Sequence, residues 1–163
     1  MGTCMLPKNC GAAVWVAGAA CSMLPDADTA AFRFGIAYSD MLGHRGLTHS
    51  LAFAALLSIA VMCVVFKDRL RSERLRIGLF LFLVTASHGV LDAFTNGGLG
   101  IAFFAPFSDE RFFFPVRPIQ VSPIGAAFFS ARGWNVLKSE LLWVWVPTLA
   151  IALAATAARA RKR

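Results

Sequence analysis

The stretch GHRGLTHSLAFAALLSIAVMCVVF, residues 43–66, places polar side chains at the entrance of a long apolar run. Residues 50–66 carry no charge and approach the roughly 20 residues that a helix needs to cross a bilayer. Just before this run lie Arg45 and two of the chain's three histidines, His44 and His49. Titratable groups are costly inside a membrane, so this pattern predicts a membrane helix with a polar site at its N-terminal end.

Composition supports a membrane protein over the whole chain. Of the 163 residues, 58% are hydrophobic and the mean hydropathy is +0.65, which is more apolar surface than a soluble protein of this size can bury. Apolar segments lie at residues 11–24, 50–66, 77–91 and 141–158. We expect an all-α integral membrane protein, a single domain over residues 1–163, with about four transmembrane or membrane-embedded helices. The first segment is short, so a tilted helix, a re-entrant piece and a signal peptide stay open as alternatives.

The basic residues indicate orientation in a membrane and no nucleic-acid partner. The net charge is +7, but Lys and Arg cluster beside apolar segments, within residues 67–76 and at the C-terminus. Placing both clusters in the cytoplasm leaves ten of the 16 basic residues inside and six outside, the sign that the positive-inside rule requires. The ten are Lys8, Lys67, Arg69, Arg71, Arg74, Arg76, Arg159, Arg161, Lys162 and Arg163. This predicts a multi-pass protein with both termini cytoplasmic and with residues 25–49 and 93–140 together on the outer side.

Residues 99–140 form a segment of a different kind. Prolines interrupt it and favour extended or turn geometry, whereas many phenylalanines make it too apolar for a solvated loop. We expect an aromatic-rich lid that lies in the membrane interface. Trp143 and Trp145 would anchor the last helix at the same level.

A polar stripe interrupts the third apolar segment. Its members are Thr85, His88, Asp92 and Thr95, spaced i, i+3, i+7 and i+10, which on a helix is one face. His88 and Asp92 are four residues apart and would project toward the same point. An ionisable pair in a membrane helix calls for a partner, either a metal ion or a hydrogen bond that joins two helices.

The HRGLTHS motif carries the other two histidines. His44 and His49 lie about 140° apart on an ideal helix, so both cannot face one site if the whole stretch is helical. The glycines beside His44 favour a turn there, with a helix that begins near Thr48 as its N-cap and with His49 in its first turn. Free backbone N–H groups at this end, together with Arg45, would favour an anion.

LPDAD, residues 24–28, supplies two oxygen ligands directly after the first apolar segment. By itself D-x-D is typical of a turn or a helix cap. With the histidine motifs it brings the candidate metal ligands to Asp26, Asp28, His44, His49, His88 and Asp92. A zinc ion with an open position needs three protein ligands, so this set indicates two ions, or one ion with supporting partners.

The motifs LPDAD, HRGLTHS, HGVLDAFTNGG and PFSDERFFFP, in this order between apolar segments, resemble the YdjM-like inner-membrane metal-dependent hydrolases, a family associated with LexA-regulated genes. The resemblance covers roughly residues 24–123. It implies a multi-helix protein of the bacterial inner membrane whose six His and Asp candidates hold a divalent metal, zinc being the expected ion. The family is also distantly similar to zinc-dependent phospholipase C and P1-type nucleases, helical enzymes that cleave phosphate esters. It supplies no physiological substrate.

We therefore expect a hydrolase that cleaves a phosphate ester of a lipid-like substrate at the outer membrane face with a metal-activated water. Asp26 or Asp92 would accept the proton, and Arg45 would assist catalysis by binding the phosphate. The substrate-binding candidates are Arg45, Thr48, Ser108 and Arg111. One alternative is a non-catalytic membrane protein whose metal or His/Asp cluster is structural. A transporter is a further alternative, but residues 77–84 do not continue the polar path.

Overall fold

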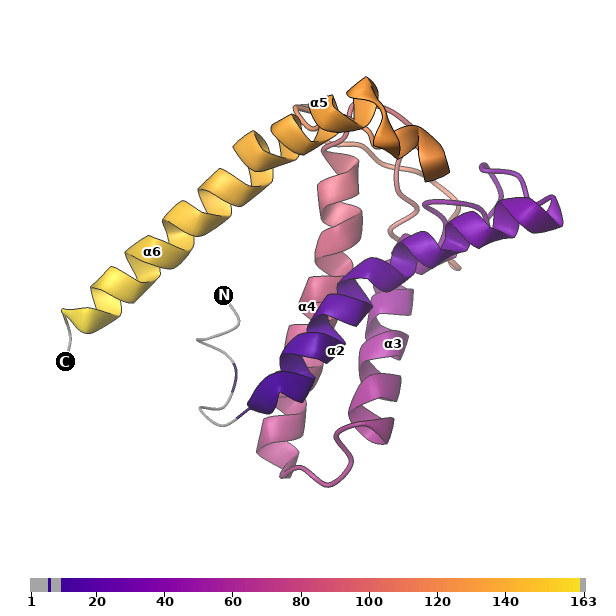
Figure 1. Ribbon diagram of the computed structural model, residues 1–163. Helices are drawn as coiled ribbons and strands as arrows, with labels where there is room; N and C mark the ends of the chain where they lie inside the picture. Colours follow the sequence, from indigo (N-terminus) through magenta and orange to yellow (C-terminus); the bar gives the residue numbers. More distant parts are fainter. Residues whose placement is uncertain (1–5, 7–9, 162–163) are drawn as a thin grey trace. The chain divides into compact units, whose positions relative to one another are not determined.

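The computed structural model describes Leu6 and residues 10–161, and within this part of the chain the regular elements are all helical (Figure 1). The all-α prediction is therefore confirmed. The chain divides into two compact units, the first comprising Met1–Ala93 with Leu99–Phe114 and the second Phe94–Gly98 with Pro115–Arg163. Each unit is described by itself below. The assignment of residues 1–163 to a single domain stays a prediction.

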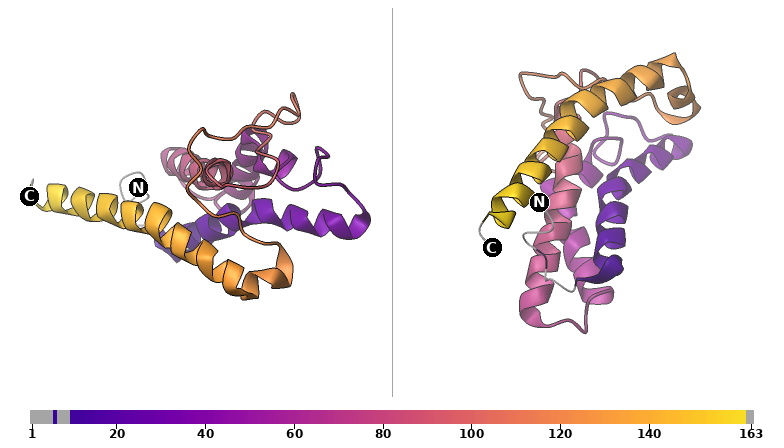
Figure 2. Two further views of the ribbon diagram at one scale, coloured as in Figure 1. Left: turned by 90° about the horizontal axis from the view of Figure 1, so that it is seen from above. Right: turned by 60° about the vertical axis from the view of Figure 1, so that its left-hand side comes forward.

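Three α-helices of the first unit pack side by side (Figures 1 and 2). They are α2 (Gly11–Met23), α3 (Leu51–Val64) and α4 (Arg71–Ala93). Along the chain, two 3₁₀ segments connect α2 to α3, namely η1 (Leu24–Phe34) and η2 (Leu47–His49). α4 packs against both α2 and α3. Val14 of α2 and Ile77 and Leu81 of α4 are fully buried in the core that these helices share. This apolar contact holds the helix ends that carry the predicted site.

The helix boundaries near the site differ from two of the predictions. Ser50, and not Thr48, is the N-cap of α3, because the extended backbone of Ser50 (φ −79°, ψ 157°) lets its hydroxyl accept a bond from an N–H of the first turn. The Thr48 hydroxyl is engaged elsewhere, since it donates to Asp28. α4 begins at Arg71, well before the apolar run, because Arg and Glu are good helix formers. His44 lies in a turn, as the sequence predicts.

An irregular hairpin, Leu99–Phe114, completes the first unit. Ile101 and Phe112 exchange two backbone hydrogen bonds of 2.9 and 3.0 Å, and Ile101 is fully buried. The backbone N–H of Leu51 donates to the carbonyl of Phe103 at 3.0 Å. The hairpin is thereby tied to the start of α3, next to the histidine motif.

One continuous helix dominates the second unit. It consists of α5 (Ala131–Glu140), a π-helical turn η4 (Leu141–Trp145) and α6 (Val146–Ala160), and the short 3₁₀ segment η3 (Gly125–Phe129) precedes it. The sequence predicts that the last helix begins at residue 141, and this is wrong. Hydropathy marks only the apolar part of the helix, whereas the more polar residues of α5, which follow the last proline of the segment, Pro123, are helical too. The predicted lid 99–140 is therefore not one irregular segment, since its last residues belong to α5.

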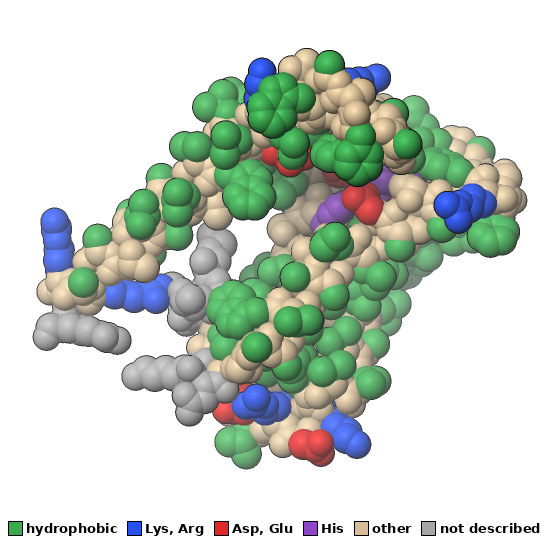
Figure 3. Space-filling view, viewed as in Figure 1, with side chains coloured by type: hydrophobic (Ala, Val, Ile, Leu, Met, Phe, Trp, Pro, Cys, Tyr) green, Lys and Arg blue, Asp and Glu red, His purple; other side chains and the backbone are tan. Residues whose placement is uncertain are grey.

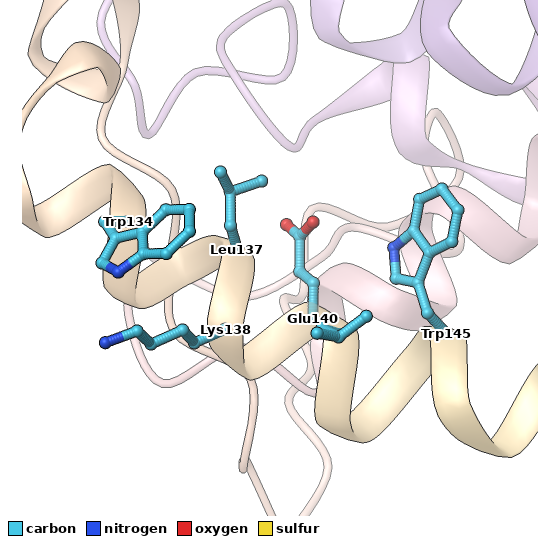
Figure 4. A pocket seen from close by; sticks show the side chains of 6 residues that line it. Trp134, Leu137, Lys138, Glu140 and Trp145 are labelled. Atoms are coloured by element: carbon cyan, nitrogen blue, oxygen red, sulfur yellow. The ribbon is translucent and has the colours of Figure 1, made fainter.

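Side chains of α5 and η4 line an apolar pocket of about 380 Å³ in the second unit (Figure 4). Trp134 and Trp145 flank Leu137 and Glu140 along the helix in this view. The Lys138 ammonium lies 5.6 Å from the centre of the Trp134 ring, a cation–π distance. Tryptophan beside a basic residue is typical of a membrane–water interface.

Two helices in the described residues are long and apolar enough to cross a membrane, Arg71–Ala93 and Ala131–Ala160. Leu51–Val64 is apolar but shorter, and α2 has 13 residues. Length and composition therefore support two spans, and the number of about four stays a prediction.

Candidate metal centre

Three elements of the first unit bring the predicted ligands together. Asp26 and Asp28 come from η1, His44 and His49 from η2 and the turn before it, and His88 and Asp92 from α4. Residues two apart in a 3₁₀ helix point about 120° apart, so Asp26 is exposed while Asp28 is buried. His88 and Asp92 share one face of α4 because they are four residues apart. Histidine and carboxylate side chains meet on the face shown in Figure 3.

Asp26, His49, His88 and Asp92 form the outer group, whose ligand atoms all lie within 4.8 Å of one another. His49 Nε2 is 3.6 Å from Asp26 Oδ1 and 3.5 Å from Asp92 Oδ2. His88 Nε2 is 3.3 Å and 4.0 Å from the same two oxygen atoms. Two imidazole nitrogens and two carboxylate oxygens thus converge on one small volume, so three of these groups could hold a zinc ion with an open position while the fourth stays available for proton transfer.

The environment of His49 Nε2 tests whether a cation fits the outer group. This nitrogen is buried and makes no hydrogen bond within the part of the chain that the structure describes. The carboxylate oxygens of Asp26 and Asp92, at 3.6 and 3.5 Å, surround this nitrogen. A divalent ion placed between the nitrogen and these oxygens would bind both kinds of ligand, so the residues present fit a metal ion.

Asp28 is the centre of a second, inner group. His44 Nδ1 donates to Asp28 Oδ1 at 2.6 Å, and His49 Nδ1 lies 3.2 Å from Asp28 Oδ2. The Thr48 hydroxyl and, at 3.2 Å, the backbone N–H of Arg45 also donate to Oδ2. Asp28 therefore orients the His49 ring from the nitrogen that faces away from the outer group, as carboxylates commonly do behind metal-bound histidines.

Carboxylates crowd around His49 and favour a positive charge there. Burial by itself would lower the pKa of His49, but the contacts with Asp26, Asp28 and Asp92 outweigh it and raise this pKa to about 10. Burial would likewise raise the pKa of Asp26, yet His49 and His88 hold that pKa well below its usual range. The cluster therefore demands a cation, which is either a proton on His49 or a metal ion in its place.

Arg45 approaches the cluster through an unusual backbone conformation. Its φ of 64° is in the left-handed region, uncommon for a residue other than glycine, and only 3% of the residue is exposed. The guanidinium Nε lies 3.1 Å from Asp92 Oδ2, and the Arg45 carbonyl accepts a 3.1 Å bond from the N–H of Ala102 in the hairpin. The sequence predicts that Arg45 binds an anionic substrate, whereas the structure pairs its charge with Asp92.

Arg111 ties the hairpin to the loop that carries His44. Its two terminal nitrogens donate, at 3.1–3.5 Å, to the carbonyl oxygens of Tyr38, Ser39, Asp40, His44 and Gly100. These nitrogens carry four N–H bonds, and all are used on backbone acceptors. The Ser108 hydroxyl accepts from the N–H of Glu110 at 3.2 Å. The geometry gives Arg111 a role in holding the loop, and substrate contact by Ser108 and Arg111 stays a prediction.

Sequence reasoning did not single out Gly89, which lets α4 approach the histidine motif. A Cβ at Gly89 would lie 2.9 Å from the carbonyl oxygen of His49. The signal was present in HGVLD, residues 88–92, because a glycine inside a helix costs about 1 kcal/mol and needs a reason.

The predicted polar stripe is shorter than expected, since Thr95 lies beyond the end of α4 and the Thr85 hydroxyl donates to a carbonyl of its own helix.

These observations define a helical protein with helices of membrane-spanning length and a His/Asp cluster that fits a metal ion. The chain belongs to the YdjM inner membrane protein family, whose sequence model matches residues 1–162. It is similar to the inner membrane protein YbcI of Escherichia coli (strain K12), with 44% identity over 133 residues that cover 80% of this chain and 76% of YbcI. No solved structure matches the chain. The family resemblance is therefore confirmed and supports an inner-membrane location, and neither description names an activity.

Proposed function

We propose that this protein is a membrane-bound metal-dependent hydrolase that cleaves a phosphate ester of a lipid-like substrate at the outer group. The buried Nε2 of His49 carries the proposal, because among the described residues it makes no hydrogen bond and it faces two carboxylates and a second imidazole. The Asp26 side chain is 56% exposed, so one side of the outer group is open to water and substrate. A catalytic metal site needs such an opening, whereas a structural site is closed.

One ion accounts for the contacts better than two. The inner group, Asp28 with His44 and His49, is also compact enough to hold an ion. However, His44 and Asp28 already bond each other at 2.6 Å, so their ligand atoms are satisfied. We assign both residues to the support of His49. A zinc ion in the outer group would supply a Lewis acid that activates water and polarises the ester.

The protein's own side chains divide the remaining work. Asp26 is the more exposed carboxylate of the outer group, 56% against 21% for Asp92, so it is the proposed proton acceptor. Arg45 orients Asp92 through its Nε, and it brings positive charge to the edge of the group. Thr48 positions Asp28 through its hydroxyl. Hydrolysis then adds the hydroxyl of water to phosphorus, and the leaving oxygen takes the proton that Asp26 has accepted.

The outer group and the basic connection between α3 and α4 lie at opposite ends of α4. This helix has 23 residues, and at 1.5 Å per residue it is about 35 Å long, enough to cross a bilayer. Lys67 and Arg69 lie just before its start, whereas His88 and Asp92 lie in its last turns. The positive-inside rule places the connection in the cytoplasm. We therefore propose that the outer group faces the outer side and that both termini are cytoplasmic.

The alternative is a non-catalytic role in which the cluster only holds three elements together. The contacts of Asp28 favour it, because they join η1 to the turn before α3 through His44 and Thr48 without any ion. In that case the metal-loaded protein would be stable but inert. Metal content alone does not separate the two roles, and turnover does.

The test measures metal content and ester hydrolysis on the same preparations. Purified protein is loaded with zinc or manganese, and release of phosphate or of a phosphorylated head group is followed on a panel of phospholipids and isoprenoid phosphates, in detergent and in liposomes. We expect about one ion per chain and metal-dependent release. Asp26→Asn should lower the release, because Asp26 is the proposed proton acceptor, and should leave the ion held by His49, His88 and Asp92. Asp40→Asn is the matched control, because Asp40 is an exposed carboxylate that accepts a bond from Ala37 N.

Two outcomes would count against the proposal. Protein that neither retains nor takes up a divalent ion rejects the metal centre. Metal-loaded protein that cleaves no ester of the panel favours the structural role.

A further inference from the structure

The hairpin of the first unit contains an apolar pocket that the proposed function does not use. Its volume is about 320 Å³, and it is lined by Ala93, Phe103, Phe104, Phe112, Phe113 and Phe114. The Phe104 and Phe112 rings meet edge to face with their centres 5.6 Å apart, and Phe103 lies 6.4 Å from Phe112. All six lining side chains are apolar, so the pocket suits a hydrocarbon group.

This phenylalanine pocket and the outer group are built on neighbouring residues of α4. Ala93 follows the proposed ligand Asp92 directly, and the Cα atoms of consecutive residues are about 3.8 Å apart. Gly89 and Ala93 form the stripe of α4 next to His88 and Asp92. A Cβ at Gly89 would lie 3.6 Å from the Phe103 ring, so this stripe faces the hairpin. Neighbouring faces of one helix turn thus serve the ligands and the pocket.

We propose that the phenylalanine pocket binds the hydrocarbon chain of the substrate while the phosphate ester lies at the outer group. This inference rests on the proposed hydrolase function. The pocket's volume of about 320 Å³ and its wholly apolar lining suit a stretch of hydrocarbon chain. The substrate class is therefore a phosphate ester on a long apolar chain, alkyl or isoprenoid, and not a water-soluble phosphate ester.

The pocket acts by position and shape more than by hydrophobic affinity. A lipid chain that leaves the bilayer for an apolar pocket gains little, because lipid tails are as apolar as the pocket wall. The benefit is that a chain held beside Ala93 keeps its ester next to Asp92, which raises the effective concentration of the reacting groups. Phe107 provides a matched control, since it lies on the same hairpin, is 89% exposed and does not line the pocket.

The experiment is photo-crosslinking of the full-length protein in lipid nanodiscs. The probe is dodecyl phosphate with a diazirine in mid-chain, and labelled peptides are mapped by mass spectrometry. We expect label within residues 99–114 that dodecyl phosphate displaces and butyl phosphate does not. Phe104→Ala should lower this label about tenfold, equivalent to about 1.4 kcal/mol. Phe112→Ala is a second pocket variant, and Phe107→Ala should leave the label unchanged.

The outcomes separate this inference from the proposed function. Label that is not displaced and spreads over the apolar faces of α3 and α4 means ordinary bilayer contact only, and it overturns the inference. An equal loss of label in Phe104→Ala and Phe107→Ala overturns the inference as well. A loss of label in Phe104→Ala but not in Phe107→Ala, with wild-type zinc content in both, supports it. Displaceable hairpin label in a protein that cleaves no ester retains the pocket and rejects the hydrolase. Cleavage of esters by a protein without hairpin label retains the hydrolase and rejects the pocket.

Discussion

Replacing Asp28 by asparagine tests how the proposed metal ligand His49 is positioned. Asp28 accepts a 2.6 Å bond from His44, lies 3.2 Å from His49 Nδ1 and accepts the Thr48 hydroxyl. An asparagine keeps the shape, but it removes the charge and turns an NH₂ group toward one of these donors. A hydrogen bond to a charged group contributes about 1.5–3 kcal/mol, and loss of a carboxylate behind a metal-bound histidine lowers metal affinity about 10–100-fold. We therefore expect Asp28→Asn to lower the stability by about 1.5–3 kcal/mol and the zinc affinity about 10–100-fold.

The assay titrates zinc against a chelator of known affinity and follows thermal unfolding of the same detergent-solubilised preparation. Thr48→Val is the comparison variant, because it removes a neutral hydroxyl that contacts Asp28 and, at 3.1 Å, His49 Nδ1, and it leaves the charge of Asp28. About 1 kcal/mol should be lost, and zinc affinity should fall less than in Asp28→Asn. Wild-type zinc affinity in Asp28→Asn would refute the reasoning that Asp28 orients His49. A loss as complete as that of His49→Ala would show that Asp28 is itself a ligand.

Three further changes test the close approach of α4, the hairpin and the orientation in the membrane. Gly89→Ala should lower the metal content and reduce the free energy of unfolding by about 1–3 kcal/mol, because the new methyl group would lie 2.9 Å from the backbone carbonyl oxygen of His49. Gly78→Ala is the control, since its methyl group meets only a flexible methionine sulfur at 3.1 Å. Equal metal content in the two variants would contradict this reasoning. Arg111→Lys should speed hydrogen exchange in the loop that it holds, since an ammonium has three donors for five carbonyls, and unchanged exchange would speak against that role. In intact cells Asp40→Cys should react with an impermeant thiol reagent and Ser72→Cys should not; the opposite pattern would reverse the proposed orientation.

Much of the helical architecture was predictable because hydropathy is a local property. The uncharged run at 50–66 predicts α3, whose bounds are Leu51–Val64. The starts of α4 and of the last helix were missed, because residues 71–76 and 131–140 contain polar side chains that a helix tolerates and hydropathy does not mark. The cap of α3 was misplaced by two residues, since the choice between Thr48 and Ser50 depends on a bond from Thr48 to a residue far away in the sequence.

For the candidate site, the sequence by itself determined which side chains have ligand chemistry and that His88 and Asp92 share a face. Both follow from residue type and from the period of a helix, which are local. Only the tertiary structure divided the candidates into an outer and an inner group, because that depends on how η1 and η2 pack against α4. It also paired Arg45 with Asp92 and surrounded the Arg111 guanidinium with carbonyl oxygens. Such contacts join residues distant along the chain, and no local periodicity encodes them.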